Sequence, residues 1–122
     1  MKLLSITLEN FRQFYNKQKI QFADGDRNVT IVFGENGKGK TGIFRALVFG
    51  LFGEVYLAQD NNKDKIHLVN FLKLDENEGM PVNATVKIEF EHKGEKYFIE
   101  RTAQGYKMNN IIEERILSPK LY

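Results

Sequence analysis

The sequence predicts an α/β fold in which one helix packs beside a partly antiparallel sheet. Residues 28–33 (NVTIVF) form an apolar run rich in β-branched side chains, which is typical of a buried strand. A glycine-rich turn joins them to residues 41–52, whose apolar side chains recur at helical spacing. Farther along, residues 82–91 alternate strictly between apolar and polar side chains, as in a strand with one buried face. These features predict a strand–turn–helix unit followed by a separate strand pair.

Two short strands are expected before the strand–turn–helix unit. Residues 3–9 (LLSITLE) start apolar and then alternate, and residues 19–22 (KIQF) alternate again. Residues 10–16 break the alternation, so we expect them to form an ordered turn. A second turn is expected at residues 24–26 (DGD).

The segment after the helix is expected to be irregular. Residues 54–65 are polar and predict a mobile surface loop, whereas residues 66–72 are apolar enough to form a short helix. Residues 75–81 carry acidic, glycine and proline residues that predict another loop.

A hairpin is expected at the end of strand 82–91. Residues 92–95 (HKGE) predict the connection, and residues 96–102 predict the returning strand. Beyond Gly105, four apolar residues fit either a strand or a short helix, and both alternatives stay open. These residues are Ile111, Ile112, Ile116 and Leu117.

Length, charge and cysteine content limit the classes of protein to which this chain can belong. A chain of 122 residues with 42 % hydrophobic and 28 % charged residues predicts one globular domain. The net charge of +2 is too small to indicate nucleic-acid binding by itself. The absence of cysteine excludes disulfides and Cys-based zinc sites. Because the sequence contains neither a signal peptide nor an apolar run of about 20 residues, it predicts a cytoplasmic protein.

The turn between strand and helix carries a phosphate-binding pattern. Residues 34–41 (GENGKGKT) fit the template of Gly, any four residues, Gly, Lys and Ser or Thr, known as the P-loop or Walker A motif. Glycines allow successive N–H groups to point into one concavity, where the helix dipole adds to the attraction for phosphate. We expect Lys40 to reach the terminal phosphates as the catalytic cation and the Thr41 hydroxyl to ligate Mg²⁺. The alternative is a glycine-rich turn without a ligand.

Seven residues around this turn are predicted to bind nucleotide. They are Asn36, Gly37, Lys38, Gly39, Lys40, Thr41 and Gly42. The expected ligands are ATP and Mg²⁺.

Four segments together resemble a known family. They are residues 4–12 (LSITLENFR), 28–37 (NVTIVFGENG), 45–53 (RALVFGLFG) and 90–101 (FEHKGEKYFIER). They resemble the N-terminal lobe of the SMC-like ABC ATPase head, an AAA-family group that includes SbcC-type repair exonuclease subunits, RecF and the DndD ATPase of DNA sulfur modification. The P-loop indicates nucleotide binding, whereas the Asn-Phe-Arg run and the later Tyr-x-Ile-x-Arg hairpin distinguish this family from other P-loop families.

The resemblance implies a P-loop NTPase fold in which residues 1–122 form the N-terminal ATP-binding lobe. It implies ATP hydrolysis by the full-length protein in DNA repair, processing or sulfur modification. The implied partners are the protein's own C-terminal lobe, a second ATPase head in a dimer, DNA, and a nuclease or modification-complex subunit. The resemblance also places Arg12 and Gln13 in the nucleotide pocket, and the alternative for Arg12 is a surface arginine in a loop.

The sequence departs from the family pattern at two positions. The residue before Gly39 is commonly Ser in the family and is Lys38 here, which places an extra cation beside the phosphates or toward a partner. The residue after Thr41 is commonly a second hydroxyl residue and is Gly42 here, so a possible side-chain bond to phosphate is lost.

Several motifs of the complete ATPase are not recognisable in this sequence. They are the Walker B Asp-Glu pair, the signature motif, the switch His and the Gln-loop. His67 and His92 lie in other contexts and are expected to be ordinary surface or boundary residues. We therefore expect a fragment that lacks the coiled coil and the C-terminal lobe, and that is inactive alone.

Two rival functions belong to other classes. A self-contained small P-loop NTPase or kinase is disfavoured, because the sequence lacks an Asn-Lys-x-Asp guanine motif and a second acidic catalytic motif. The other rival is a clamp for DNA or a partner that uses nucleotide without turnover.

Overall fold

One antiparallel sheet dominates the fold. A computed structural model describes residues 2–22, 37–55 and 67–122, and it describes side chains from Gly42 onward in the second range. Over these residues the sheet has six strands in the order β2-β1-β3-β4-β5, and β6 pairs with Ile99 and Glu100 of β4, on the same edge as β5. The strands are β1 (Lys2–Phe11), β2 (Phe14–Gln21), β3 (Val82–His92), β4 (Glu95–Met108), β5 (Ile111–Ile116) and β6 (Lys120–Leu121).

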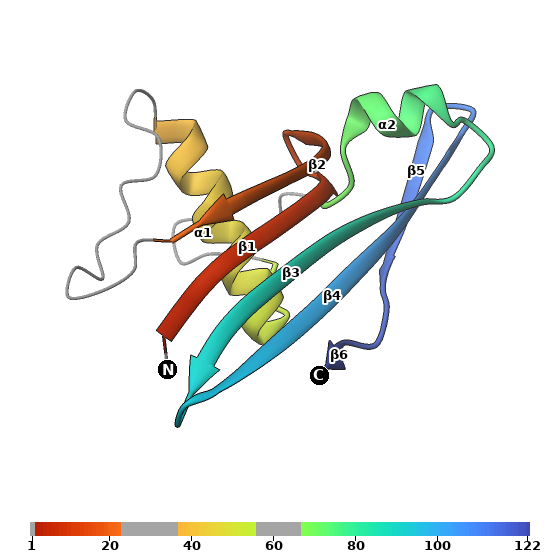
Figure 1. Cartoon of the computed structure of the whole chain (residues 1–122). Coiled ribbons are helices and arrows are strands. Elements are labelled where there is room, and N and C mark those ends of the chain that lie inside the picture. The colour runs from red at the N-terminus through yellow and green to blue at the C-terminus, as the bar shows by residue number, and fades with distance from the viewer. Residues whose placement is uncertain (1, 23–36, 56–66) are drawn as a thin grey trace.

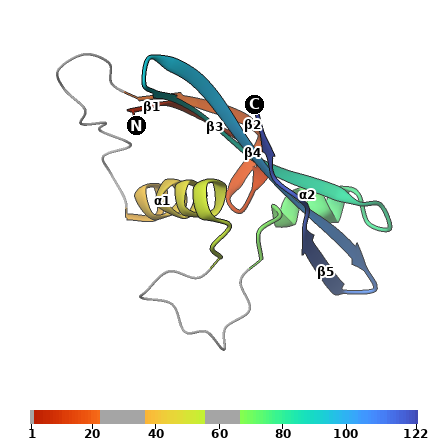
Figure 2. The same cartoon turned by 90° about the horizontal axis from the view of Figure 1, so that it is seen from below.

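Two helices accompany the sheet in the described ranges, α1 (Gly37–Phe52) and α2 (Phe71–Glu76). Figure 1 shows α1 running behind the strands, while α2 lies at one end of the sheet, beside the upper end of β5. Figure 2 shows α1 against one face of the sheet. Among the described residues, no element covers the opposite face of the central strands.

The core lies between α1 and the sheet. Ile6 of β1 is in register with Ile88 of β3, and both are fully buried on the face that α1 covers. Phe49 of α1 stacks on Phe11, with their ring centroids 5.5 Å apart. A half-covered sheet of this kind requires alternating strands, and β3 has that pattern over most of its length.

The strongest expectations from the sequence are confirmed. The predicted strand 82–91 is β3, and Lys93 and Gly94 form its turn with positive φ angles of 53° and 79°. The predicted helix 41–52 lies within α1. The predicted turn 24–26, strand 28–33, residues 34–36 of the predicted loop and most of the predicted loop 54–65 lie outside the described residues.

The ordered turn predicted at residues 10–16 is wrong in extent. Strand β1 continues to Phe11 and β2 begins at Phe14, so that only Arg12 and Gln13 form the turn. Phe11 and Phe14 pair across the strands and are both buried. A bulge between Glu9 and Phe11, with Asn10 at a φ of 53°, interrupts the alternation that the sequence pattern required.

The short helix predicted at residues 66–72 is displaced toward the C-terminus, and residue 66 lies outside the described residues. Val69 makes an isolated antiparallel bridge with Phe11, and α2 starts only at Phe71. Asn70 is the N-cap of α2, because its side chain accepts a hydrogen bond of 3.0 Å from the backbone N–H of Lys73. The loop predicted from residue 75 starts correspondingly later, after Glu76.

The alternatives left open beyond Gly105 are decided in favour of strands. Strand β4 continues to Met108, and β5 returns beside it. Asn109 and Asn110 connect them with φ angles of 53° and 64°. Asparagine tolerates this left-handed region, which two-residue hairpin turns favour.

Candidate functional site

Helix α1 brings the predicted phosphate-binding residues into its first turns. It begins at Gly37, so that the backbone of residues 37–42 is helical, and its first turn contains no acidic residue. An α-helix leaves its first N–H groups without intrahelical partners, which makes such an end attractive to anions. Asn36 and the side chains of Lys38, Lys40 and Thr41 lie outside the described part of the chain.

Gln13 lies directly against the start of α1. Gly42 is buried, and a Cβ added there would come within 2.0 Å of Nε2 of Gln13. The glycine therefore leaves the space that the Gln13 amide occupies. Two residues that the sequence places far apart, both predicted to bind nucleotide, meet at this point.

Arg12 occupies the tight turn between β1 and β2. It is half-buried, and its φ of 49° lies in the left-handed region. Its N–H donates to the carbonyl of Leu68 over 2.8 Å, and its Nη1 donates to the carbonyl of His67 over 3.3 Å. Arg12 is therefore held by a neighbouring segment, unlike the surface arginine of the alternative interpretation.

Residues 67–70, called the docking segment below, run beside this turn. The N–H of Asn70 donates to the carbonyl of Asn10, and its side-chain amide donates to the carbonyl of Arg12, both over 2.8 Å. The same residue caps α2. The docking segment thus connects the Arg12 turn to helix α2.

A cavity of about 480 Å³ lies beside the Arg12 turn and the docking segment. It is lined by Arg12, Gln13, His67, Val69, Asn70, Phe71 and Leu72. His67 and Phe71 meet edge to face at 5.2 Å between ring centroids. The sequence analysis missed the last five of these residues, and it treated His67 as an ordinary boundary residue. The Asn70 cap before the apolar Phe71 and Leu72 is the one local signal that indicates the start of α2.

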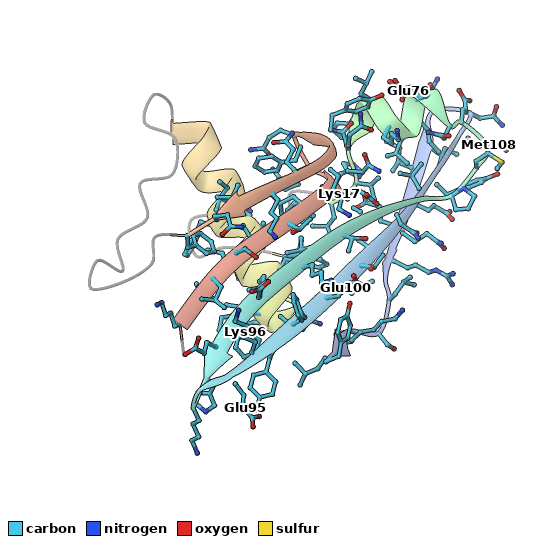
Figure 3. All side chains as sticks on the ribbon, in the orientation of Figure 1. Lys17, Glu76, Glu95, Lys96, Glu100 and Met108 are labelled. Carbon is cyan, nitrogen blue, oxygen red and sulfur yellow. The ribbon has the colours of Figure 1, made fainter. Side chains whose placement is uncertain are left out.

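A second hollow of about 390 Å³ lies on the open face of the sheet, and its residues are called the lysine groove below. It is lined by Ser5, Thr7, Lys17, Lys19, Lys87, Glu89 and Phe98. The register places Lys19, Thr7 and Lys87 in one row across β2, β1 and β3. Figure 3 looks onto this face of the sheet and labels Lys17 on it.

Metal-binding clusters and membrane-spanning helices are both absent from the described ranges. Among those residues, no group of three or more His, Asp or Glu side chains is placed to hold a metal ion. Neither of the helices in that part of the chain is long and apolar enough to cross a membrane.

The family follows from a match over most of the chain. The model of an AAA domain family matches residues 5–119. The chain belongs to this family. Together with the relatives that follow, the match identifies the chain as the N-terminal region of an SMC-like ABC ATPase head.

Three relatives illustrate this membership. The DNA double-strand break repair Rad50 ATPase of Methanosarcina acetivorans is 35 % identical over 101 residues, which cover 83 % of this chain and 8 % of the relative. The protein of the same name from Methanococcus maripaludis is 31 % identical over 110 residues, 90 % of this chain and 10 % of the relative. The SbcC component of the SbcCD nuclease from Staphylococcus aureus is 38 % identical over 65 residues, 52 % of this chain and 6 % of the relative. The chain thus spans a small part of the length of these relatives.

Proposed function

We propose that this chain binds ATP and Mg²⁺ as the N-terminal half of an ATPase head that acts on DNA in repair or processing. The observation that carries the proposal is the contact of Gln13 with Gly42. It joins the Arg12 turn and its cavity to the helix that follows the predicted P-loop. The phosphate-binding pattern and the family-derived arginine thereby become parts of one site.

Each predicted residue has a distinct role in this site. The backbone N–H groups of residues 36–42 surround the phosphates, Lys40 neutralises charge at their terminal end, and Lys38 adds a second cation nearby. Arg12 and Gln13 approach from the β1–β2 turn as donors, since guanidinium and amide groups suit phosphate oxygens. Thr41 would hold Mg²⁺, which supplies further charge neutralisation on the phosphates when bound. The start of helix α1 at Gly37 and the cavity that Gln13 links to it support a nucleotide of this kind.

Hydrolysis requires groups from outside this chain. We assign the water-activating carboxylate to the C-terminal lobe and the signature motif to a second head, as the resemblance implies. Two exposed phenylalanines on α1, Phe44 at 55 % and Phe52 at 71 % exposure, support a further layer over this helix. The named nuclease relative supports a nuclease subunit as partner. The cytoplasmic location and a role in DNA sulfur modification rest on the sequence alone.

The test is nucleotide binding by calorimetry. Lys40→Ala should weaken ATP binding by roughly 1.5–3 kcal/mol, the value of a hydrogen bond to a charged group. Lys93→Ala is a matched control, because it removes the same charge at the exposed β3–β4 turn. Equal affinities for the wild type and Lys40→Ala would contradict the assignment.

The lysine groove favours a second function, a nucleotide-dependent clamp on DNA. Two lysines on β2 and one on β3 line the same hollow, and these three cations outnumber the single carboxylate there, Glu89, which suits a phosphate backbone. Exchanging Lys19 and Lys87 together for Ala should weaken binding to duplex DNA and reduce its salt dependence, with a slope change of about 0.9 per lost phosphate contact. An unchanged salt slope, measured by fluorescence anisotropy against the Lys93→Ala control, would exclude the groove as a DNA contact.

A further inference from the structure

We infer that Glu114 is a positioning residue whose carboxylate on β5 holds the docking segment in place, so that the segment orients Arg12 toward the nucleotide. The inference rests on the proposed nucleotide site and adds a residue to it. No motif in the sequence indicates this role, because Glu114 lies in a short strand of isoleucine and charged residues, far from the P-loop in the sequence.

The contact between Glu114 and the docking segment is dense. Its Oε1 accepts from the N–H of Leu68 at 2.9 Å, and its Oε2 accepts from the N–H groups of Leu68 at 3.0 Å and Val69 at 2.9 Å. Nδ1 of His67 lies 3.9 Å from Oε1. Leu68 and Val69 are only 5 % and 1 % exposed. Their N–H groups are remote from water and need this acceptor, because a buried donor without a partner is costly.

The neighbouring strand leaves room for this contact. Gly105 of β4 is in register with Glu114, and a Cβ at Gly105 would lie 2.8 Å from Cγ2 of Val69 and 3.3 Å from Cδ2 of Leu74. Val69 therefore rests on the backbone of β4 itself. The space left by Gly105 on β4 and the carboxylate of Glu114 on β5 together hold the docking segment against the sheet.

The other side of the docking segment holds Arg12. The carbonyls of Leu68 and His67 accept from the N–H and from Nη1 of Arg12, at 2.8 Å and 3.3 Å. The chain of contacts runs from Glu114 through the Leu68 carbonyl to the backbone of Arg12, and through the His67 carbonyl to its guanidinium. Arg12 lines the cavity. Because peptide units are planar, the N–H bonds fixed by Glu114 also fix the direction of these carbonyls.

Glu114 could affect ATP binding through its negative charge or by positioning Arg12, and the two roles predict opposite changes in ATP affinity when Glu114 is removed. If Glu114 acted only through its charge, its removal near a phosphate site would tighten ATP binding. If it positions Arg12, the same removal weakens binding, by about fivefold for the equivalent of one ordinary hydrogen bond. Glu113→Ala is the matched control, since Glu113 is exposed, adjacent in β5 and equally charged.

The first experiment needs no nucleotide. Amide hydrogen exchange of Leu68 and Val69 should be at least about tenfold faster in Glu114→Ala than in the wild type or Glu113→Ala. NMR relaxation of the Arg12 side chain should show increased motion in the same variant. Gly105→Ala, which changes no charge but displaces Val69, should reproduce both effects. Unchanged exchange and unchanged Arg12 motion in Glu114→Ala would overturn the inference.

The second experiment measures ATP affinity in a double-mutant cycle. Glu114→Ala should weaken binding in the wild-type background and have no further effect in Arg12→Ala, because it acts through Arg12. Equal effects in both backgrounds, or tighter binding, would overturn the inference. Glu114→Gln retains one acceptor oxygen and should be intermediate, so that it replaces Glu114→Ala if that variant does not fold.

The two proposals fail in different ways. The proposed function is contradicted if the wild-type chain binds no ATP, or if the Lys40→Ala variant binds ATP as tightly as the wild type. The exchange and relaxation measurements then decide by themselves whether Glu114 positions Arg12. Lys40-dependent ATP binding with no effect of Glu114→Ala contradicts the positioning role alone.

Discussion

Arg12, which we propose to contact the nucleotide, is held in place by neighbouring residues of the chain. Its backbone adopts a left-handed conformation, with a φ of 49°, that non-glycine residues seldom adopt. Contacts with the docking segment hold both its backbone and its guanidinium. A long side chain that is fixed in advance loses less conformational entropy on binding, which favours affinity.

Exchange of Arg12 for Ala is expected to affect both affinity and stability. ATP binding should weaken by roughly 1.5–3 kcal/mol through loss of a charge-assisted contact, and unfolding should become easier by about 1 kcal/mol through loss of the bond to His67. Arg12→Lys keeps the charge but not the planar fork, so it should recover only part of the affinity. Calorimetry and thermal melting measure the two effects. A stability loss without any change in affinity would show that Arg12 is purely structural.

Gly42 is expected to control the place of the Gln13 amide. Gly42→Ala should stabilise helix α1 by up to about 1 kcal/mol, because alanine has the higher helix propensity. The new methyl group must displace Nε2 of Gln13, from which its Cβ would be 2.0 Å away. ATP affinity should therefore fall to the level of Gln13→Ala, and the double variant should lose no more. Gly42→Ala with wild-type affinity would contradict this role.

At the scale of elements, helix α2 is too short to be stable by itself and depends on its anchors. Tyr15 on β2 donates to both carboxylate oxygens of Glu76, at 2.6 Å and 2.7 Å, and Lys107 on β4 pairs with Asp75. Leu74 of α2 is itself fully buried. Because Asn70 caps α2 and also belongs to the docking segment, these anchors hold one wall of the candidate site.

The anchors of α2 should weaken at alkaline pH. The hydrogen bond to Glu76 raises the pKa of Tyr15 above its usual 10.0, and the hydrogen bond to Asp75 raises the pKa of Lys107 above its usual 10.5. In both cases the folded pKa exceeds the unfolded one, so their contribution is complete below the unfolded pKa and is lost as pH rises through the folded pKa. Denaturant unfolding between about pH 8 and about pH 12 should show this loss.

The control for the pH effect is Tyr15→Phe with Lys107→Met, which removes both titrating groups. The alkaline decline in the free energy of unfolding should be smaller in this variant. An identical decline in both proteins would show that other groups cause it.

At the scale of the whole molecule, the described part of the chain is a sheet with a helix on one face only. Helix α1 packs on the sheet through residues such as Phe49, whereas Phe44 and Phe52 of the same helix are largely exposed. The proposed site likewise supplies donors and cations for phosphates, while the motifs that activate water are not recognisable in the sequence. Both features suit a lobe that is completed by another part of an ATPase head.

The chain alone is expected to bind ATP without turnover. Catalysis of phosphoryl transfer depends on positioning the water and on stabilising the charge of the γ-phosphate in the transition state. Contacts that bind substrate without these groups give affinity but no rate. Phosphate release should be negligible for the 122-residue chain and should appear when the matching C-terminal lobe is added. Robust turnover by the chain alone that disappears in Lys40→Ala would favour the self-contained enzyme instead.

The spacing of apolar and polar residues predicted those elements in which every second or every third to fourth side chain faces the core. Strand β3 was predictable because its alternate side chains face a single core, and its hairpin because Gly94 suits a left-handed turn. The helix expected at residues 66–72 begins only at Phe71, because Val69 is buried in an antiparallel bridge with Phe11, whereas Phe71 and Leu72 stay exposed. Burial alone does not distinguish the two solutions in a short segment.

The sequence by itself determined the family, the phosphate-binding pattern of residues 34–41 and the patterns of the main strand pair and helix, because each is encoded by neighbouring residues. Only the tertiary structure decided which distant residues form one site. Gln13 can approach Gly42 only because the glycine has no side chain. Glu114 and Gly105 hold the docking segment together because the register of β4 and β5 places them opposite each other. These contacts arise from the order of strands in the sheet, which no local spacing of residues specifies.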